Sequence, residues 1–476
     1  MSKGGSLSAG AGESVRARKA RQVLWPRNRS LFQAVFLPLL AVAAGAADWP
    51  QLQNGPQRLG YSPENVDLPL KAAWQRPFSP ERLHPQAQPV IAAGKIFIGT
   101  EMGTLYALDA LTGQEIWKTK VGGPILHTVG VEGGKVFGAC LDGKVYARKT
   151  ADGAEAWTFD SQLPTGFSTA VLLAEGNVYA ANRGGAYFAL SQQDGAVVWR
   201  QELGIPLLMS SAYNDGVLFL GAMDMRCYAL DAKTGQVRWK SEVLPGAAFK
   251  DYWPVAFKGR VLLRPMRSSM TWTQPFAVEW LGGPLPEAEL AKQEKRIENI
   301  TKSGDKDLFV LNQTDGKEAF VVPQWTTTTM NGAVAPPCVD GDGLLIVPVT
   351  IHDWRGGWGR LDLEKRRVVE LLCEGPPAQA GKQPVGMGNG DENMLASAAG
   401  RLAFILHTEE GNANYTGVWH IERRKWVQLQ AAHVDRFFVS NTQGGGGNPG
   451  AVSGGMLFHT SWNTVNARKL TVTGDR

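Results

Sequence analysis

The sequence predicts an all-β protein, an eight-bladed β-propeller of four-stranded antiparallel blades, and two observations support this prediction. A phrase that reads ALDALTGQEIW at 107–117 returns at 147–157, 189–199 and 229–239, so its closing tryptophans recur about every 40 residues. Around each copy, apolar and polar residues alternate with period two, which is typical of half-buried strands. Short strands repeated at this interval indicate a propeller.

Each repeat also carries the turn and aromatic residues that a blade needs. Pairs such as Thr112-Gly113 and Thr234-Gly235 stand between the last two strands, and glycine there supplies the positive φ of a tight hairpin. The closing tryptophan is expected on the outermost strand, packed against the next blade, with a small residue such as Ala107 leaving room for it. Burying such a ring removes roughly 150–250 Å² from water, so these tryptophans are interpreted as structural.

Eight blades can be counted along the chain. Four are clear, at roughly 94–120, 134–160, 176–203 and 216–243. The fifth is interrupted by an insertion of about residues 268–306, in which PEAELAKQEKRIENI is expected to be helical. Two further blades follow, and the eighth lacks an outer strand. The segment LKAAWQRPF at 70–78 is predicted to complete that blade and close the ring, which removes exposed sheet edges.

The repeat resembles that of a known superfamily. The pattern A-x-D-x-x-T-G-x-x-x-W, complete at 107–117 and 229–239, resembles the repeat of the pyrroloquinoline-quinone (PQQ)-like propellers. The opening DWPQ at 48–51 and the GPQRLG at 55–60 resemble the start of many exported proteins of that kind. The superfamily includes quinoprotein alcohol dehydrogenases and the outer-membrane assembly factor BamB, so the resemblance implies the fold and leaves the activity open.

A targeting segment is predicted at the N-terminus. Basic residues from Arg16 to Arg29 precede the apolar run LFQAVFLPLLAVAAGAA, whose end is rich in small residues, as in a secretory signal. The mature chain is expected to begin at Ala47 or Asp48. The expected domains are therefore a signal peptide at 1–47 and a propeller at 48–476, exported to the periplasm or the cell exterior without a stable membrane anchor.

Charge and cysteine content narrow the classes of partner. The formal net charge of +5 derives from the basic N-terminal segment, so the rest of the chain is near neutral and no nucleic-acid binding is expected. Cys140 and Cys227 fall on strands of different blades and are expected to be buried thiols. Cys338 and Cys373 fall in one predicted blade, and their pairing is left open. The oligomeric state is also left open.

No catalytic residue, metal ligand or cofactor is predicted. The resemblance implies that a PQQ enzyme would need an adjacent Cys-Cys pair and acidic and amide side chains for an ion. This chain has no adjacent cysteines and no CxxCH motif. Asp251, Asp353 and Glu409 are possible bases, but no pattern distinguishes them from other carboxylates. PQQ is therefore not expected as a cofactor.

A binding surface is predicted on the face that carries the longest loops, between second and third strands and between blades. Aromatic residues mixed there with Asn, Gly and charged residues are typical of recognition surfaces, although some of the tryptophans could instead fill the central channel. His352, His407 and His459 are predicted to face this side in successive blades, more as ordinary hydrogen-bonded histidines than as metal ligands. The candidate residues are Trp272, Trp280, His352, Trp354, Trp358, His407, Asn412, Tyr415, His459 and Trp462.

These observations favour an exported, non-catalytic propeller that binds a protein or peptide or acts as a scaffold, with a BamB-like architecture. One alternative is a PQQ- or metal-dependent enzyme on the same face, and another is a carbohydrate-binding propeller that uses the tryptophans. A pocket with carboxylates and an ion would favour the enzyme, and a flat aromatic platform would favour the sugar binder. A shallow apolar groove or an open strand edge would favour the protein binder.

Overall fold

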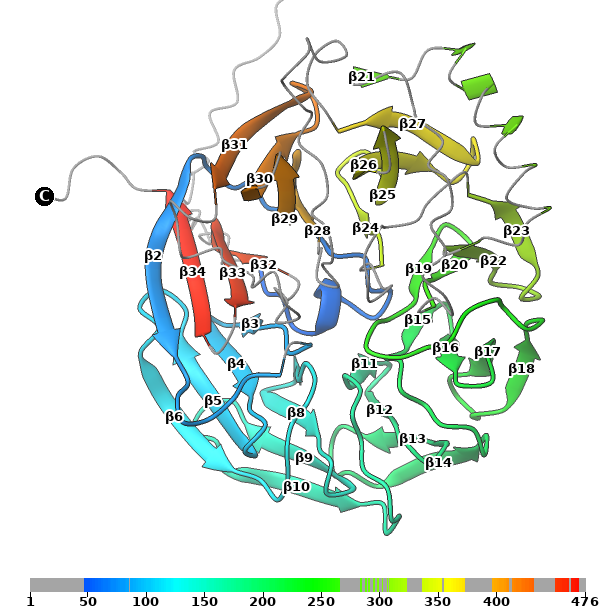
Figure 1. The fold of residues 1–476 in the computed structure, drawn as a ribbon. Coiled ribbons are helices and arrows are strands. Elements are labelled where there is room, and N and C mark those ends of the chain that lie inside the picture. Colours follow the sequence, from blue (N-terminus) through cyan, green and yellow to red (C-terminus); the bar gives the residue numbers. More distant parts are fainter. Residues whose placement is uncertain are drawn as a thin grey trace, which may run out of the picture. The chain divides into compact units, whose positions relative to one another are not determined.

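Eight β-sheets surround a central axis in the computed structural model (Figure 1). The structure describes residues 47–476 except 85, 266–282, 323–335, 353–354, 373–395, 411–412, 432–449, 462–463, 471–476 and scattered positions between 285 and 307. Residues Ala44–Arg476 form one compact unit. The predicted eight-bladed propeller is therefore confirmed.

Blades 1 to 4 share one plan, in which four antiparallel strands follow one another from the axis outward. Blade 1 consists of β3 (Val90–Ala92), β4 (Lys95–Gly99), β5 (Thr104–Asp109) and β6 (Glu115–Lys120). Blade 2 consists of β7 (Gly130–Glu132), β8 (Lys135–Ala139), β9 (Lys144–Lys149) and β10 (Glu155–Asp160). Blade 3 consists of β11 (Leu172–Ala174), β12 (Asn177–Ala181), β13 (Ala186–Ser191) and β14 (Val197–Glu202). Blade 4 consists of β15 (Ala212–Asn214), β16 (Val217–Ala222), β17 (Arg226–Asp231) and β18 (Val237–Lys240).

Blades 5 to 8 keep this plan with additions. Blade 5 consists of β19 (Val255–Phe257), β20 (Arg260–Leu263), β22 (Phe309–Asn312) and β23 (Glu318–Val321). Blade 6 consists of β24 (Cys338–Val339), β25 (Leu345–His352), β26 (Arg355–Asp362) and β27 (Arg367–Leu371). Blade 7 consists of β28 (Ala396–Ala399), β29 (Leu402–Glu410), β30 (Ala413–His420) and β31 (Lys425–Ala431). Blade 8 consists of β32 (Ala451–Ser453), β33 (Met456–Ser461), β34 (Thr464–Leu470) and β2 (Leu70–Pro77).

The N-terminal strand closes the ring, as predicted. Strand β2 pairs antiparallel with β34, and Trp74 lies opposite Ala467. This pairing places the outermost strand of the last blade almost 400 residues before its partner, so blade 8 forms only when both ends of the propeller meet. Closure leaves no blade with a missing outer strand.

Two details differ from the four-stranded prediction. Blades 6 and 7 each gain a short fifth strand, β21 (Gly283–Pro284) outside β27 and β1 (Tyr61–Ser62) inside β28. The helical insertion in blade five is not supported, because scattered described residues between 287 and 302 have helical backbone but form no bounded helix. The described residues also contain no helix long and apolar enough to cross a membrane.

The core lies between neighbouring sheets. Strands β5 and β9 are buried along most of their length, because each sheet is covered on both faces by the blades beside it. In blades 1 to 4 the outermost strands, such as β6 and β14, alternate between buried and exposed residues. In these blades the half-buried pattern predicted for the repeats therefore belongs to the outer strands.

The closing tryptophans join consecutive blades. Their indole N–H groups donate to backbone carbonyls of the next blade: Trp74 to Ala110 (3.1 Å), Trp117 to Thr150 (3.1 Å), Trp157 to Gln192 (3.0 Å), Trp199 to Ala232 (2.9 Å) and Trp239 to Gln313 (2.9 Å). Each ring also lies against the glycine of the next blade's outer turn. A Cβ added to Gly235, which has φ +74°, would lie 2.6 Å from the Trp199 ring. The turn glycine is thus required both by its φ and by the tryptophan beside it.

This contact predicts a stability effect at the junction of blades 3 and 4. Trp199 is 8% exposed, so Trp199→Ala is expected to lower the free energy of unfolding by about 3–5 kcal/mol. Gly235→Ala is expected to be destabilising as well, because its φ and the ring both oppose a side chain. The control is Val198→Ala on the same strand, which is 50% exposed and should change stability by less than about 0.5 kcal/mol. Denaturant unfolding measures all three; equal effects of Trp199→Ala and Val198→Ala would contradict the junction.

Candidate functional site

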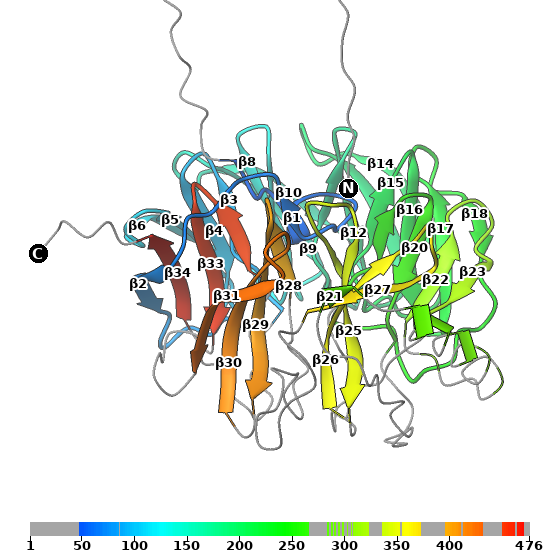
Figure 2. The same ribbon diagram turned by 90° about the horizontal axis from the view of Figure 1, so that it is seen from above.

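The two faces of the ring are built differently. The short-turn face carries the tight turns between first and second strands and between third and fourth strands. The loop-rich face carries the connections between second and third strands and between blades. On this face blades 6 and 7 extend their central strands: β25, β26 and β30 have 8 residues and β29 has 9, against 5 for β4, β8 and β12. Figure 2 shows the two resulting hairpins projecting from one side of the ring.

Most of the predicted binding residues cannot be placed by their side chains. Trp272, Trp280, Trp354, Asn412 and Trp462 lie outside the described residues. His352, His407 and Tyr415 lie on β25, β29 and β30, where only the backbone is described. The long hairpins therefore contain three of the candidates, and the role of these eight residues stays a prediction.

Two candidates are core residues and form no part of an accessible surface. Trp358 is 2% exposed and lies on β26 opposite Pro348, in a cluster with Cys338, Ile346 and Trp419. His459 is 2% exposed on β33. The sequence predicts that Trp358 lies on the loop-rich face, but Gly356, Gly357 and Gly359 around it are strand residues paired with β25. A substitution of Trp358 would consequently test folding and not binding.

The axis is occupied by the segment 47–64, here called the hub, which the sequence did not identify as a structural element. Figure 1 shows this dark blue stretch in the middle of the ring. It contains a short 3-10 turn, η1 (Leu52–Asn54), and strand β1. Its residues meet the first strands of blades 1 to 7 and the turn after the first strand of blade 8 in chain order, so it makes one circuit of the axis.

The contacts of the hub are hydrogen bonds to the innermost strands or their turns. They join Trp49 to Ile91 of blade 1 (2.8 and 2.9 Å), Pro50 to Val131 of blade 2 (2.7 Å), the Gln51 side chain to Leu173 of blade 3 (3.1 Å), Pro56 to Tyr213 of blade 4 (2.8 Å), Gln57 to Ala256 of blade 5 (3.0 Å), Leu59 to Val339 of blade 6 (2.8 Å), Gly60 to Ala398 of blade 7 (2.9 Å) and the Glu64 carboxylate to Gly454 of blade 8 (3.1 Å).

Arg58 is the buried centre of the hub. Its guanidinium donates to the Ser211 carbonyl (2.9 Å), the Leu52 carbonyl (2.9 Å), the Val171 carbonyl (3.2 Å) and the Gln51 side chain (3.2 Å). Burial lowers the pKa of Arg58 to about 9, which keeps the group charged at neutral pH. The bonds to Val171 and Ser211, which directly precede β11 and β15, thus join the hub to blades 3 and 4, and the bonds to Leu52 and Gln51 lie within the hub.

A buried His-Ser pair lies beside the hub, but it is not arranged for nucleophilic catalysis. His127 Nε2 faces Ser210 Oγ at 3.3 Å, while its Nδ1 accepts the Thr128 N–H at 2.8 Å. The proton of the neutral ring is therefore on Nε2, whereas a general base would need Nε2 free to accept from the serine. Burial, followed by the positive groups of His84 and Arg58, lowers the pKa of His127 to about 3, too low for a base near neutral pH. The pair is structural.

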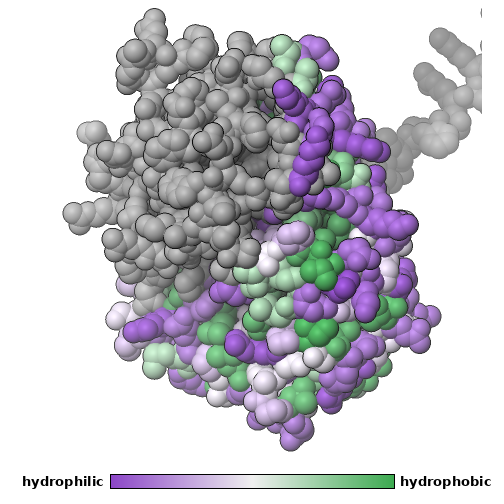
Figure 3. Space-filling model, turned by 45° about the vertical axis from the view of Figure 1, so that its right-hand side comes forward, coloured by the Kyte–Doolittle hydropathy of each residue, from purple (hydrophilic) through white to green (hydrophobic). Residues whose placement is uncertain are grey.

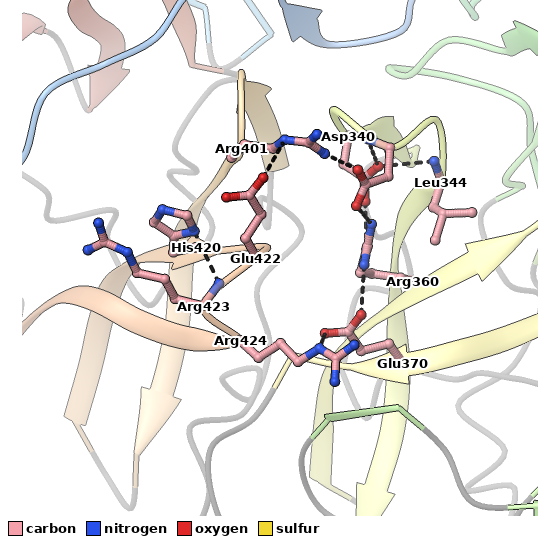
Figure 4. Close-up of polar contacts among 10 residues, drawn as sticks. Asp340, Leu344, Arg360, Glu370, Arg401, His420, Glu422, Arg423 and Arg424 are labelled. Atoms are coloured by element: carbon pink, nitrogen blue, oxygen red, sulfur yellow. Dashed lines mark hydrogen bonds and ion pairs between the residues drawn. The ribbon is translucent and has the colours of Figure 1, made fainter. Parts of the chain in front are cut away.

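An ion-pair network joins blades 6 and 7 on the short-turn face (Figure 4). Arg360 on β26 contacts Asp340 (2.7 Å), Asp342 (2.6 Å) and Glu370 (2.7 Å), all in blade 6. Asp342 also pairs with Arg401 of blade 7. Burial opposes the charge on Asp342, but the hydrogen bonds and charges of Arg360 and Arg401 outweigh it and lower the pKa of Asp342. The ion pair between Asp342 and Arg401 thus links blades 6 and 7, beyond the five tryptophan junctions described above.

The described residues offer few reactive or metal-binding groups. In this part of the chain no three His, Cys, Asp or Glu side chains cluster as metal ligands would. Cys140, Cys227 and Cys338 are buried free thiols, and burial raises the pKa of each. Cys338 is thus not paired with Cys373, which lies outside the described residues.

The outer wall of the ring is mixed in character. Exposed apolar residues lie on the outermost strands: Ile116 on β6, Val197 and Val198 on β14, and Val237 on β18. Figure 3 shows apolar side chains interspersed with hydrophilic ones on the described surface. The visible wall therefore does not identify a docking patch by itself.

A family model described as outer membrane protein assembly factor BamB matches residues 70–203, 141–250 and 189–350. Together these overlapping matches span more than half of the chain. The chain belongs to this family. Its propeller fold is the one that the resemblance to PQQ-like propellers implied.

The relatives of this BamB-family propeller share its fold at low identity. BamB of Yersinia pestis is 29% identical over 169 residues, which is 32% of this chain and 43% of that protein, so the match spans less than half of the curated relative. BamB from Moraxella catarrhalis is 16% identical with a TM-score of 0.52, over 84% of this chain and 100% of that one. A europium-containing methanol dehydrogenase is 11% identical with a TM-score of 0.57, over 89% of this chain and 98% of that one. At these identities the two solved structures show the fold alone.

The buried histidines predict how stability responds to acid. Burial, followed by nearby positive charge, lowers the pKa of His127 and of His459 to about 3, against an ordinary value of 6.5. The unfolded chain therefore binds these protons more readily, so the stability they permit is fully present above pH 6.5 and is lost as the pH falls toward 3.

Urea unfolding between about pH 7 and pH 4 tests this dependence. The free energy of unfolding should fall with acid in the wild-type protein, with a contribution on the order of a few kcal/mol from each histidine. His127→Gln should show a shallower fall, because glutamine does not titrate. An identical pH dependence in the variant and the wild type would contradict the assignment.

Proposed function

We propose that this BamB-family propeller is an exported, non-catalytic scaffold that binds a protein or peptide partner through its loop-rich face. The observation that carries the proposal is the difference between the two faces. The hub is hydrogen-bonded to the innermost strands and their turns, whereas the hairpins β25–β26 and β29–β30 project on the opposite side. Family membership supports a protein partner, because the matched relatives are named as outer membrane protein assembly factors.

The projecting hairpins have a physical argument of their own. Extending two adjacent blades costs ordering entropy, and the extra residues add nothing to the contacts between the short inner strands. In the sequence, the candidate residues Trp354 and Asn412 fall between the paired strands of these hairpins. Aromatic and amide side chains are frequent anchors of protein interfaces.

Shortening the hairpins tests the proposal. Thr350 lies opposite Gly356 and Thr408 lies opposite Tyr415, so replacing 351–355 and 409–414 each by Asn-Gly leaves both hairpins closed by a two-residue turn. We expect the shortened protein to keep its thermal midpoint and to lose capture of the envelope partner by at least about tenfold, as loss of central anchors does. Quantitative crosslinking in envelope extract measures capture.

A matched control lies on the other face. Lys233 is exposed in the turn before β18, and Lys233→Glu should leave capture unchanged. Loss of capture in Lys233→Glu, with capture retained in the shortened protein, would assign the partner to the short-turn face instead. Trp354→Ala in the full-length hairpin then tests the single aromatic residue.

The competing quinoprotein function has a direct test. We expect no stoichiometric binding of PQQ, with or without calcium, because the chain lacks the adjacent cysteine pair and the pattern of ion ligands that the dehydrogenases carry. Titration calorimetry of the purified protein measures this. Binding of one PQQ per chain at micromolar affinity would replace the scaffold proposal with a dehydrogenase.

A further inference from the structure

The end of the hub holds a carboxylate that is only partly satisfied. Glu64 Oε1 accepts the N–H of Ala47 at 2.8 Å and the N–H of Gly454 at 3.1 Å. Its second oxygen, Oε2, is buried and has no hydrogen-bond partner among the described residues. A buried carboxylate oxygen without a donor is costly, so this arrangement calls for an explanation.

The chemical state of the Ala47 nitrogen, which donates to Glu64, provides an explanation. While Ala46 is attached, the Ala47 nitrogen is an amide that offers one proton and no charge. A free α-ammonium at the same nitrogen offers three protons and a positive charge, enough to serve Oε1 and also Oε2. A charge-assisted contact of this kind is roughly twice as strong as a neutral one.

We propose that the Glu64 carboxylate binds the α-ammonium group of a new N-terminus, which is created by hydrolysis of the Ala46–Ala47 peptide bond. An endopeptidase that cleaves after small residues adds one water across this bond. Ala46 leaves with a carboxylate, and Ala47 keeps the amino group, which takes up a proton to become the ammonium that pairs with Glu64. The proposal rests on the predicted signal segment and is independent of the partner-binding function.

The geometry also favours one of the two N-terminal residues, Ala47 and Asp48, that the sequence predicts for the mature chain. A chain that begins at Asp48 would lack the nitrogen that Glu64 now contacts, and its own terminus would be displaced by about 3.8 Å, the spacing of successive Cα atoms. Asp48 already has another role, because its carboxylate accepts the Ala93 N–H at 2.9 Å. Trp49 is fixed by its pairing with Ile91. Ala47 is therefore the start that completes the Glu64 site.

The consequence is that removal of the signal segment makes the closed ring more stable. Glu64 connects the start of the hub to the turn of blade 8 at Gly454, and strand β2, which closes that blade, begins at Leu70. An ammonium-carboxylate pair at Glu64 would fasten the hub at the point where its circuit of the axis ends. The unprocessed chain would have the same contacts with a weaker, neutral bond.

Four proteins test the proposal: chains that start at Ala47 or at Gly45, each with Glu64 or with Glu64→Gln, made from a removable fusion that leaves no extra residue. With Glu64, the Ala47 start should have a thermal midpoint higher by on the order of 2 °C. Its α-amine should react about tenfold more slowly with an acylating reagent, since pairing with a carboxylate raises the pKa of an amine. Glu64→Gln should remove both differences in the Ala47 chain and change little in the Gly45 chain.

Equal midpoints and equal amine reactivity in the two Glu64 chains would overturn the proposal, as would a difference that survives Glu64→Gln. If Glu64→Gln does not fold, acetylation of the Ala47 amine in the wild-type chain provides the same comparison, with loss of the higher midpoint expected. Export of the full-length chain gives an independent reading: N-terminal sequencing should find Ala47 first, and a start at Asp48 would refute the assignment. None of these measurements involves the partner, so the scaffold function can fail or hold separately.

Discussion

The innermost strands of a propeller converge on the axis, where each sheet ends, and each buried backbone group there needs a partner. In this protein the hub provides partners for all eight blades within eighteen residues, 47–64. The segment is irregular because it must turn around the axis, and Gln53, Asn54, Arg58 and Gly60 all have positive φ. Glycine at position 60 is required, because its φ is +62° and a Cβ there would lie 2.9 Å from the Cβ of Cys338. Since β2 follows the hub in the sequence, the same N-terminal part of the chain fills the axis and closes the ring.

The contacts that hold neighbouring blades together differ around the ring. From blade 8 round to blade 5, each junction is held by one indole ring, with a large buried area and a single hydrogen bond. Between blades 6 and 7 a buried apolar cluster that includes Trp358 and Trp419 is accompanied by the ion pair between Asp342 and Arg401. Removing one partner of an ion pair that is partly buried is destabilising, but the pair as a whole adds less than well-packed apolar residues would. Both kinds of junction thus bury apolar side chains, and the junction of blades 6 and 7 adds an ion pair that requires matched partners.

Most of the fold could be predicted from the sequence, because a repeat states the same physical requirement several times. The tryptophans, their turn glycines and the closing strand were identified from spacing and pattern alone, and the structure confirms them. The site could not be predicted as well. Trp358 lies among glycines that resemble a loop, yet the backbone there forms strand pairs, so its burial depends on a register that composition does not reveal. Arg58 and His127 are not part of the repeated pattern. Their importance depends on contacts with residues more than 60 positions away in the sequence.

The different roles that we propose for the two faces follow from these contacts. The polar groups at the axis, among them Gln51, Arg58 and His127, are engaged in holding blades together, and a ligand could recruit them only by breaking bonds that the ring needs. If the protein acts as the proposed scaffold, it recognises its partner with groups that the fold does not use. The extended strands of blades 6 and 7, on the face opposite the short turns, are the part of the ring that we propose for this role.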